Sequence, residues 1–335
     1  MPAQQAPMLA AWRHVMTMTD AVGIFEHADL AVPRRNHGYC TDDVARLLIA
    51  IVREPASGPE LNELARICFR FLTESQGVTG RTRNRRDADG RWHGRRGVED
   101  CWGRSTWAFG SAAHLARDEG MRRSAMSYFD HAVGQRSSHR RAMAFAALGA
   151  TELLAAKPGH PSALRLLADA VLTIGPVAAD RAWPWPEERL SYANAVLPEA
   201  LIAAGRLLDR PDVLADGLLL LRWLLDRQIV GGHLSPVPVA GAGRGDHAPA
   251  FDQQPIEVAA LADACARAES TTGDTAWRSG VELAIEWFIG DNDVGIPMSD
   301  PHTGGGFDGL TPNGPNLNQG AESTLALITT MQHHR

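Results

Sequence analysis

One layout occurs six times in this chain: a loop rich in carboxylates, amides, histidine and aromatic residues runs directly into a helix of mostly alanine, leucine and glycine. A helix that is apolar nearly all round is buried, so the six stretches predict an inner layer of helices. They read HGYCTDDVARLLIAIV from His37, GVEDCWGRSTWAFGSAAHLA from Gly97, SSHRRAMAFAALGATELL from Ser137, LSYANAVLPEALIAAGRLL from Leu190, FDQQPIEVAALADACARA from Phe251 and NLNQGAESTLALITTM from Asn316.

A second, amphipathic kind of helix alternates with the first. Apolar residues at three-and-four spacing predict these outer helices near Leu9, Glu60, Ser124, Ala163, Asp212 and Trp277. The inner helices are expected to start at irregular intervals, near Thr41, Glu99, Ser138, Ser191, Asp252 and Asn318, so the architecture repeats while the sequence does not. Together they predict an all-α fold, an (α/α)6 barrel of six hairpins, whose polar inner ends meet in one pocket.

No linker rich in glycine, serine or proline divides these helices, so we expect one domain over residues 1–335. The net charge is −6, and nothing indicates a nucleic-acid surface. Neither a signal peptide nor an apolar stretch of bilayer length is visible, so we expect a cytoplasmic protein with no membrane partner. Cys40, Cys68, Cys101 and Cys265 lack metal or disulfide spacing, and we expect them to be reduced and packed.

The first polar segment places Asp42 and Asp43 in the first turn of its helix. Acidic residues there are also explained by the positive helix end. His37 and Tyr39 stand beside them, and an imidazole and an aromatic ring exceed what capping needs. We therefore expect these four residues to contact substrate.

The second polar segment adds Glu99, Asp100, Trp102 and Arg104. Arg104 could pair with Asp100 four residues earlier, which would be a purely structural role. Trp102 and Trp107 are five residues apart and cannot share a helix face, so one should line the cavity and the other the core.

The remaining segments supply amides, acids and aromatic residues. Two adjacent glutamines, Gln253 and Gln254, make poor caps, which favours a role in holding hydroxyl groups. Two tryptophans flank prolines in a loop, where we expect exposed platforms. The candidate residues are His139 in the third segment, Trp183, Trp185, Glu188, Tyr192 and Asn194 in the fourth, Asp252, Gln253, Gln254 and Glu257 in the fifth, and Asn318, Gln319 and Glu322 in the sixth.

This inventory indicates a neutral carbohydrate as the substrate. Carboxylates and amides pair with hydroxyl groups, and aromatic faces pack against a pyranose ring. The sequence shows no glycine-rich phosphate loop, metal triad or nucleotide fingerprint, so we expect no cofactor and no metal.

Acids on opposite walls of a barrel would stand well apart, which suits an inverting glycosidase with one acid and one base. The second inner helix faces the fifth, so Asp100 and Asp252 form one candidate catalytic pair. Asp43 with Glu188 is another, and Glu322 is a third possibility. A general acid here needs burial or a neighbouring acid to remain protonated beside a helix amino end.

The segments HGYCTDDVAR, VEDCWGRSTWAFG, WPWPEERLSYANAVLPEAL, FDQQPIEVAALADAC and NQGAESTLAL resemble a family of bacterial six-hairpin (α/α)6-barrel proteins. Its members are found beside or fused behind glycosyltransferases, and often near β-mannoside phosphorylases. The resemblance spans nearly the whole chain, from about Val15 to Met331, and departs from the family pattern at Val44, where asparagine is usual. It implies a glycan substrate, such as a mannoside, and a functional link to a glycosyltransferase.

The segment from Arg81 to Gly97 holds seven arginines and predicts a hairpin or loop with Asp89-Gly90 at its turn. Such a segment is either a solvated loop or a site for phosphate, which keeps a glycoside phosphorylase open. We favour a glycoside hydrolase. The alternatives are a sugar epimerase or isomerase using His37, His139 or His233, and a non-catalytic glycan-binding partner of a glycosyltransferase.

Overall fold

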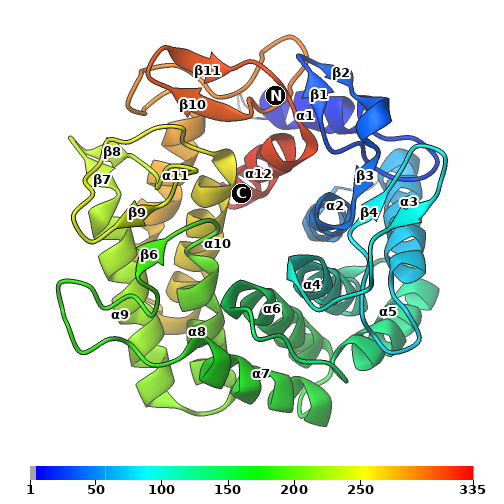
Figure 1. The fold of residues 1–335 in the computed structure, drawn as a ribbon, viewed down its shortest axis with the longest axis horizontal. Helices are drawn as coiled ribbons and strands as arrows, with labels where there is room; N and C mark the ends of the chain where they lie inside the picture. Colours follow the sequence, from blue (N-terminus) through cyan, green and yellow to red (C-terminus); the bar gives the residue numbers. More distant parts are fainter. Residues whose placement is uncertain (1–4, 57, 335) are drawn as a thin grey trace.

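The computed structural model describes residues 5–56 and 58–334, and over these residues the chain forms twelve α-helices in two concentric layers (Figure 1). The inner helices are α2 (Thr41–Arg53), α4 (Asp100–Leu115), α6 (Arg140–Ala156), α8 (Val196–Leu207), α10 (Pro255–Thr272) and α12 (Ala321–Gln332). The outer helices are α1 (Gln5–Thr17), α3 (Pro59–Ser75), α5 (Glu119–Ala132), α7 (Pro161–Ile174), α9 (Pro211–Arg227) and α11 (Arg278–Ile289). The predicted all-α (α/α)6 barrel is confirmed.

The inner helices form a closed ring, because each contacts the next and α12 returns to α2. In Figure 1 they surround the centre of the molecule, and the outer helices lie around them. Helix α1 packs against α12, so the first and last hairpins are joined in space. In a ring of this kind α4 lies opposite α10, as expected when Asp100 and Asp252 were paired on opposite walls.

Glycines bring α4 and α6 into backbone contact. A Cβ atom at Gly103 would overlap the carbonyl oxygen of Ala142, and one at Gly110 would overlap that of Gly149. Only residues without a side chain allow two helices to approach this closely. The amino ends of α4 and α6 are therefore held at a distance fixed by the backbones themselves.

Short strands occur in five of the six loops that lead into the inner helices, so this face of the barrel carries a rim of small hairpins. The strands are β1 (Ala28–Asp29), β2 (Val32–Pro33), β3 (Tyr39–Cys40), β4 (Arg85–Arg86), β5 (Trp92–His93), β6 (Arg189–Leu190), β7 (Ile229–Val230), β8 (His233–Leu234), β9 (Ala242–Gly243), β10 (Gly309–Thr311) and β11 (Gly314–Asn316). They pair antiparallel as β1-β2, β3-β4-β5, β6-β9, β7-β8 and β10-β11. The β4-β5 pair is the predicted hairpin, with Gly90 in its turn at φ 84°.

Ion pairs between the inner helices fill the axis below this face. Arg53 and His333 both contact Asp263, at 3.1 and 2.6 Å. Arg267 contacts Glu199 and Glu152, and His114 also contacts Glu152. The cavity that remains among all six inner helices has a volume of only about 50 Å³, too small for a sugar. A substrate site on the axis must therefore lie at the amino ends of the inner helices.

The largest boundary difference concerns the fourth inner helix. It begins at Val196, whereas the sequence placed its start near Ser191. Residues 191–195 form a turn in which Ala193 adopts φ 44°. Among the described helices, none combines the length and the apolar character needed to cross a bilayer.

Candidate functional site

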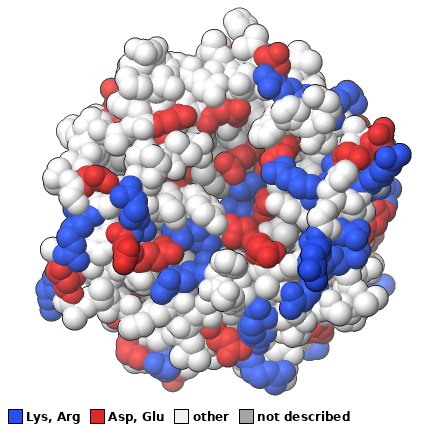
Figure 2. Space-filling model, viewed as in Figure 1, with Lys and Arg blue, Asp and Glu red and all other residues white. Residues whose placement is uncertain are grey.

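Acidic side chains, with some basic ones between them, surround the centre of the face formed by the amino ends of the inner helices (Figure 2). We give the name central site to the five candidate acids at or just before the amino ends of the inner helices, Asp42, Asp43, Asp100, Asp252 and Glu322. These residues come from α2, α4, the loop before α10, and α12. Each belongs to a polar segment recognised in the sequence.

The α2 and α12 side of the central site is organised by Arg46. Its guanidinium contacts an oxygen of Asp43 at 2.5 Å and one of Glu322 at 2.6 Å. The Asp43 side chain is only 4% exposed, and this burial raises the pKa of Asp43 to about 7 although Arg46 opposes the shift. The Glu322 side chain is 40% exposed and remains open to a ligand.

Arg104 of α4 lies beneath the carboxylates and is buried. Its Nε atom is 3.7 Å from an oxygen of Asp42, and its guanidinium lies 3.8 Å from the ring centroid of Phe145. The sequence suggested a pair with Asp100, but the ion pair that forms is with the neighbouring helix. Burial lowers the pKa of Arg104, and nearby Arg46 acts in the same direction.

Asp252 lies three residues before the start of α10, the helix opposite α4, which carries Asp100. Its Oδ1 atom is buried without a hydrogen-bond partner among the described residues and faces Gly309. Burial raises the pKa of Asp252, and the neighbouring carboxylate of Asp308 raises it further. Asp308 is itself held by Gly320 and Ser323 at the start of α12, each donating to its Oδ1 atom at 2.8 Å. Both effects favour the protonated form of the Asp252 carboxyl group.

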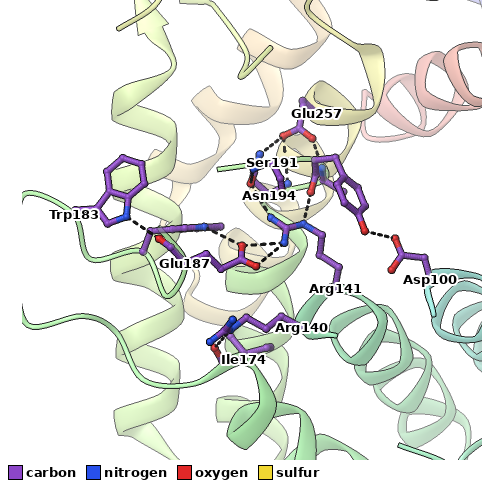
Figure 3. A network of polar contacts seen from close by, with 12 residues as sticks. Asp100, Arg140, Arg141, Ile174, Trp183, Glu187, Ser191, Asn194 and Glu257 are labelled. Carbon is purple, nitrogen blue, oxygen red and sulfur yellow. Dashed lines mark hydrogen bonds and ion pairs between the residues drawn. The ribbon is translucent and has the colours of Figure 1, made fainter. Parts of the chain in front are cut away.

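Asp100 is held from across the site by Tyr192, whose hydroxyl donates to its Oδ2 atom at 2.6 Å (Figure 3). Tyr192 is 46% exposed and precedes α8. Its ring passes over Arg141 of α6, whose guanidinium lies 5.0 Å from the ring centroid. Asn194 and Glu257 are buried behind this turn. We therefore interpret them as supports and not as residues that touch a substrate.

The buried aromatic residues correct the prediction of sugar platforms. Trp183 and Trp185 are 4% and 2% exposed, because both pack against Trp223 of α9 and hydrogen-bond to Glu187. Trp102 is fully buried and donates to the carbonyl oxygen of Ala132, whereas Trp107 lines the narrow axial cavity. Tyr39 is 1% exposed, and its hydroxyl donates to Asp20. Of the predicted aromatic contacts, Tyr192 alone is exposed.

Two amides predicted to bind hydroxyl groups are instead used inside the protein. Gln253 is fully buried and donates to Asp293, Ser235 and the backbone of residue 250. Gln319 is 2% exposed and accepts from Thr303 while donating to Asp300. Both glutamines therefore fix loops that carry the central site. Half-buried Asn318 accepts a hydrogen bond from the backbone of Leu30, and Gln254 is half-buried at the start of α10.

The other predicted contact residues are exposed. Glu99 is the residue that precedes α4, and His139 has the same position before α6. His37 lies on the rim with its ring 5.3 Å from that of His27. Glu188 is exposed and lines a separate surface pocket with Trp183 and Arg244, so the structure gives no support to its pairing with Asp43.

Three residues of the site were missed at the sequence level: Arg46, Arg141 and Asp308. Arg141 is the second residue of α6, and its partners lie 46 to 53 positions further along the chain, where no local pattern reveals them. Asp308 lies in the glycine-rich loop TGGGFDGL, and its position before an inner helix was the signal that could have identified it.

One group of side chains has metal-ligand character. Glu26, Cys40 and Asp43 bring their ligand atoms within 4.8 Å of one another. However, Glu26 pairs with Arg85, and Asp43 pairs with Arg46. Both carboxylates therefore already have a cationic partner, and the group does not fit a metal ion well.

Solved structures of several sugar-processing enzymes share this (α/α)6-barrel fold. A sugar epimerase from a ruminal bacterium superimposes with a TM-score of 0.71 at 12% identity, covering 98% of this chain and 96% of that one. A D-mannose isomerase gives a TM-score of 0.72 at 11% identity, with 98% and 96% covered. An inactive variant of a family 76 α-1,6-mannanase from Salegentibacter sp., in complex with α-1,6-mannotetrose, gives 0.65 at 10% identity, with 98% of both chains covered.

No protein-family model matches the chain, and no curated protein matches its sequence. The solved structures confirm the fold that the sequence resemblance implied. Their sequence identities of 10–12% establish the fold alone. The link to glycosyltransferases stays a prediction.

Proposed function

We propose that this protein is a carbohydrate-active enzyme that hydrolyses a glycosidic bond with two carboxylates, Asp252 as general acid and Asp100 as general base. The observation that carries the proposal is the contrast between these two side chains. Asp252 has a raised pKa and an unpartnered oxygen, while Asp100 is oriented by a tyrosine hydroxyl. Two carboxyl groups in different environments are what a division between acid and base requires.

In this reaction Asp252 gives its proton to the glycosidic oxygen as the bond to the anomeric carbon breaks. Asp100 accepts a proton from a water molecule, and the water oxygen forms the new bond to that carbon from the opposite face. The product then has inverted configuration. Asp43 is a weaker candidate for the acid, because its side chain is nearly closed off from ligands.

A neutral sugar, with a mannoside as the first choice, is the proposed substrate. The central site presents five carboxylates, which would repel an anionic sugar, and its arginines Arg46 and Arg104 already contact carboxylates. One solved structure of this fold holds a manno-oligosaccharide, and the sequence resemblance also implies a mannoside. Tyr192 supplies an exposed aromatic ring for the sugar.

The test is incubation with manno-, gluco-, galacto- and arabino-oligosaccharides, with and without phosphate, followed by chromatography. Asp100→Asn and Asp252→Asn should each lower kcat on the oligosaccharide that is cleaved by on the order of 10²–10⁴-fold. With an activated aryl glycoside, which needs little acid assistance, Asp252→Asn should regain most of its rate while Asp100→Asn should not. Asp212→Asn, on the exposed surface of α9, is the matched control. An unchanged rate in either site variant would remove that residue from the mechanism.

A sugar epimerase or isomerase is the second candidate, because the sugar epimerase and the D-mannose isomerase share this fold over nearly their whole length. Of the histidines that could move protons, His233 is held by Asp293 at 2.9 Å and is 23% exposed. Chromatography separates the two reactions, because hydrolysis releases two sugars from one while epimerisation conserves the number. A non-catalytic glycan binder would retain affinity in both variants and show no turnover.

Phosphorolysis is tested in the same experiment. In the arginine-rich hairpin Arg85 and Arg86 pair with Glu26 and Glu74, which leaves them less available to phosphate. Cleavage that depends on phosphate would favour a phosphorylase. The single domain and the cytoplasmic location remain part of this proposal.

A further inference from the structure

The contact between Tyr192 and Asp100 depends on an unusual turn. Ala193, the next residue, has φ 44°, in the left-handed region that residues with a side chain seldom adopt. Such a conformation persists only where surrounding interactions hold it. The Tyr192 hydroxyl therefore stays on Asp100 only if other residues hold this turn.

Glu257 of α10 holds the turn from one side. Its carboxylate accepts hydrogen bonds from the backbone N–H of Ala193, from the backbone N–H of Asn194 at 3.3 Å and from the Asn194 side chain at 2.8 Å. The Glu257 side chain is buried at 6% exposure. Since two of its donors are backbone groups directly after Tyr192, the carboxylate fixes the direction in which that side chain leaves the chain.

Arg141 of α6 holds the turn from the other side (Figure 3). Its Nε atom donates to the carbonyl oxygen of Tyr192 at 2.5 Å, and its two terminal nitrogens donate to Glu187 at 2.9 Å and to the Asn194 amide oxygen at 3.0 Å. It also lies beneath the Tyr192 ring. These contacts use the rigid fork of a guanidinium, which a lysine cannot reproduce.

The other end of the contact is fixed by helix packing. Asp100 begins α4, and Gly103 of α4 touches the backbone of Ala142, the neighbour of Arg141. The backbone segments that carry Asp100 and Arg141 are therefore held in a fixed position relative to each other. Only the Tyr192 turn remains to be positioned.

We propose that Arg141 and Glu257 are positioning residues, which hold the Tyr192–Asn194 turn so that the Tyr192 hydroxyl orients Asp100. This inference rests on the proposed function, since Asp100 is the base of that reaction. Neither residue touches the substrate. Each acts through Tyr192.

An NMR experiment tests the positioning without reference to activity. The chain has three tyrosines, so labelling with 3-fluorotyrosine gives three ¹⁹F resonances, and Tyr192→Phe identifies the one from Tyr192. Asp100→Asn should shift that resonance. Glu257→Gln and Arg141→Lys should shift or broaden it as well, because the hydroxyl no longer stays on Asp100. Glu199→Gln, which changes a similarly buried carboxylate in α8 that contacts Arg267, should leave it unchanged.

A kinetic cycle tests the same idea on the substrate that is cleaved. Tyr192→Phe should lower kcat, and Glu257→Gln should lower it by up to about 10²-fold, the effect of a small misplacement. The double variant should be no slower than the slower single variant, because both changes remove the same contact, that between the Tyr192 hydroxyl and Asp100. Fully multiplicative losses would overturn the proposal, as would an unmoved Tyr192 resonance in both Glu257→Gln and Arg141→Lys. If no sugar is turned over, the proposed function fails while the NMR result still decides whether the turn is positioned in this way.

Discussion

Glu257 offers a quantitative test of the balance between burial and hydrogen bonding in the site. Burial raises the pKa of this carboxyl to about 7, against the lowering effect of its hydrogen bonds to Ala193 and Asn194. A group whose pKa is higher in the folded state contributes stability that is complete below the unfolded pKa, near 4.5, and is lost as the pH rises through 7. Between pH 5 and pH 8 the loss amounts to about 2–3 kcal/mol.

The variant Glu257→Gln lacks this titration. The free-energy cost of the substitution should therefore be about 2–3 kcal/mol smaller at pH 8 than at pH 5. Urea unfolding of both proteins at the two pH values, followed by tryptophan fluorescence, measures that difference. Asp43 titrates in the same range, but it is present in both proteins, so its contribution cancels in the comparison. Glu282→Gln, at an exposed position of α11, provides the control for the change of chemistry.

A cost that is equal at both pH values would refute the reasoning. It would show that the three N–H donors keep the Glu257 carboxylate charged throughout and that burial is not the dominant effect. A cost that is larger at pH 8 would show that the donors lower the pKa below its ordinary value.

Two further predictions follow from packing. Gly103→Ala should destabilise the fold by about 1–3 kcal/mol in urea unfolding, because the new methyl group meets the α6 backbone, whereas Gly120→Ala at an exposed position of α5 should change stability by less than about 1 kcal/mol. An equal effect at the two sites would contradict the close contact. All four cysteines are buried, and burial raises the pKa of each thiol. The native protein should therefore react slowly with a thiol reagent at pH 8, whereas in the unfolded protein all four thiols should react. Fast reaction of Cys40 or Cys101 in the native state would contradict this expectation and indicate an accessible, reactive thiol.

The helical architecture could be predicted because its signal is local. An inner helix reveals itself through small apolar residues on every side, and an outer helix through one apolar stripe. The start of the fourth inner helix was placed too early, near Ser191, because the polar residues from Ser191 to Asn194 resemble the entry to a helix, whereas the Asn194 side chain binds Arg141 and Glu257 of other helices. Such contacts leave no pattern within a single segment.

The same limit explains the success and failure of the site prediction. The candidate acids could be singled out because they lie at or just before the starts of buried helices in the sequence, and their catalytic role stays a prediction. The roles of Trp183 and Gln253 could not be predicted. Trp183 packs onto Trp223 of α9 and Gln253 binds Asp293, but in the sequence alone both look like exposed ligand-binding residues. Polar side chains are therefore poor guides to ligand contact wherever long-range partners can satisfy them.

The glycine contact between α4 and α6 also limits how this site could be redesigned. With Gly103 and Gly110 lying directly against the opposing backbone, that wall cannot part to admit a bulkier ligand without losing its packing. Nor can it be narrowed by adding side chains, since there is no space for even a methyl group. Engineering or natural divergence toward larger substrates would have to act on the loops ahead of α10 and α12, on the other side of the barrel.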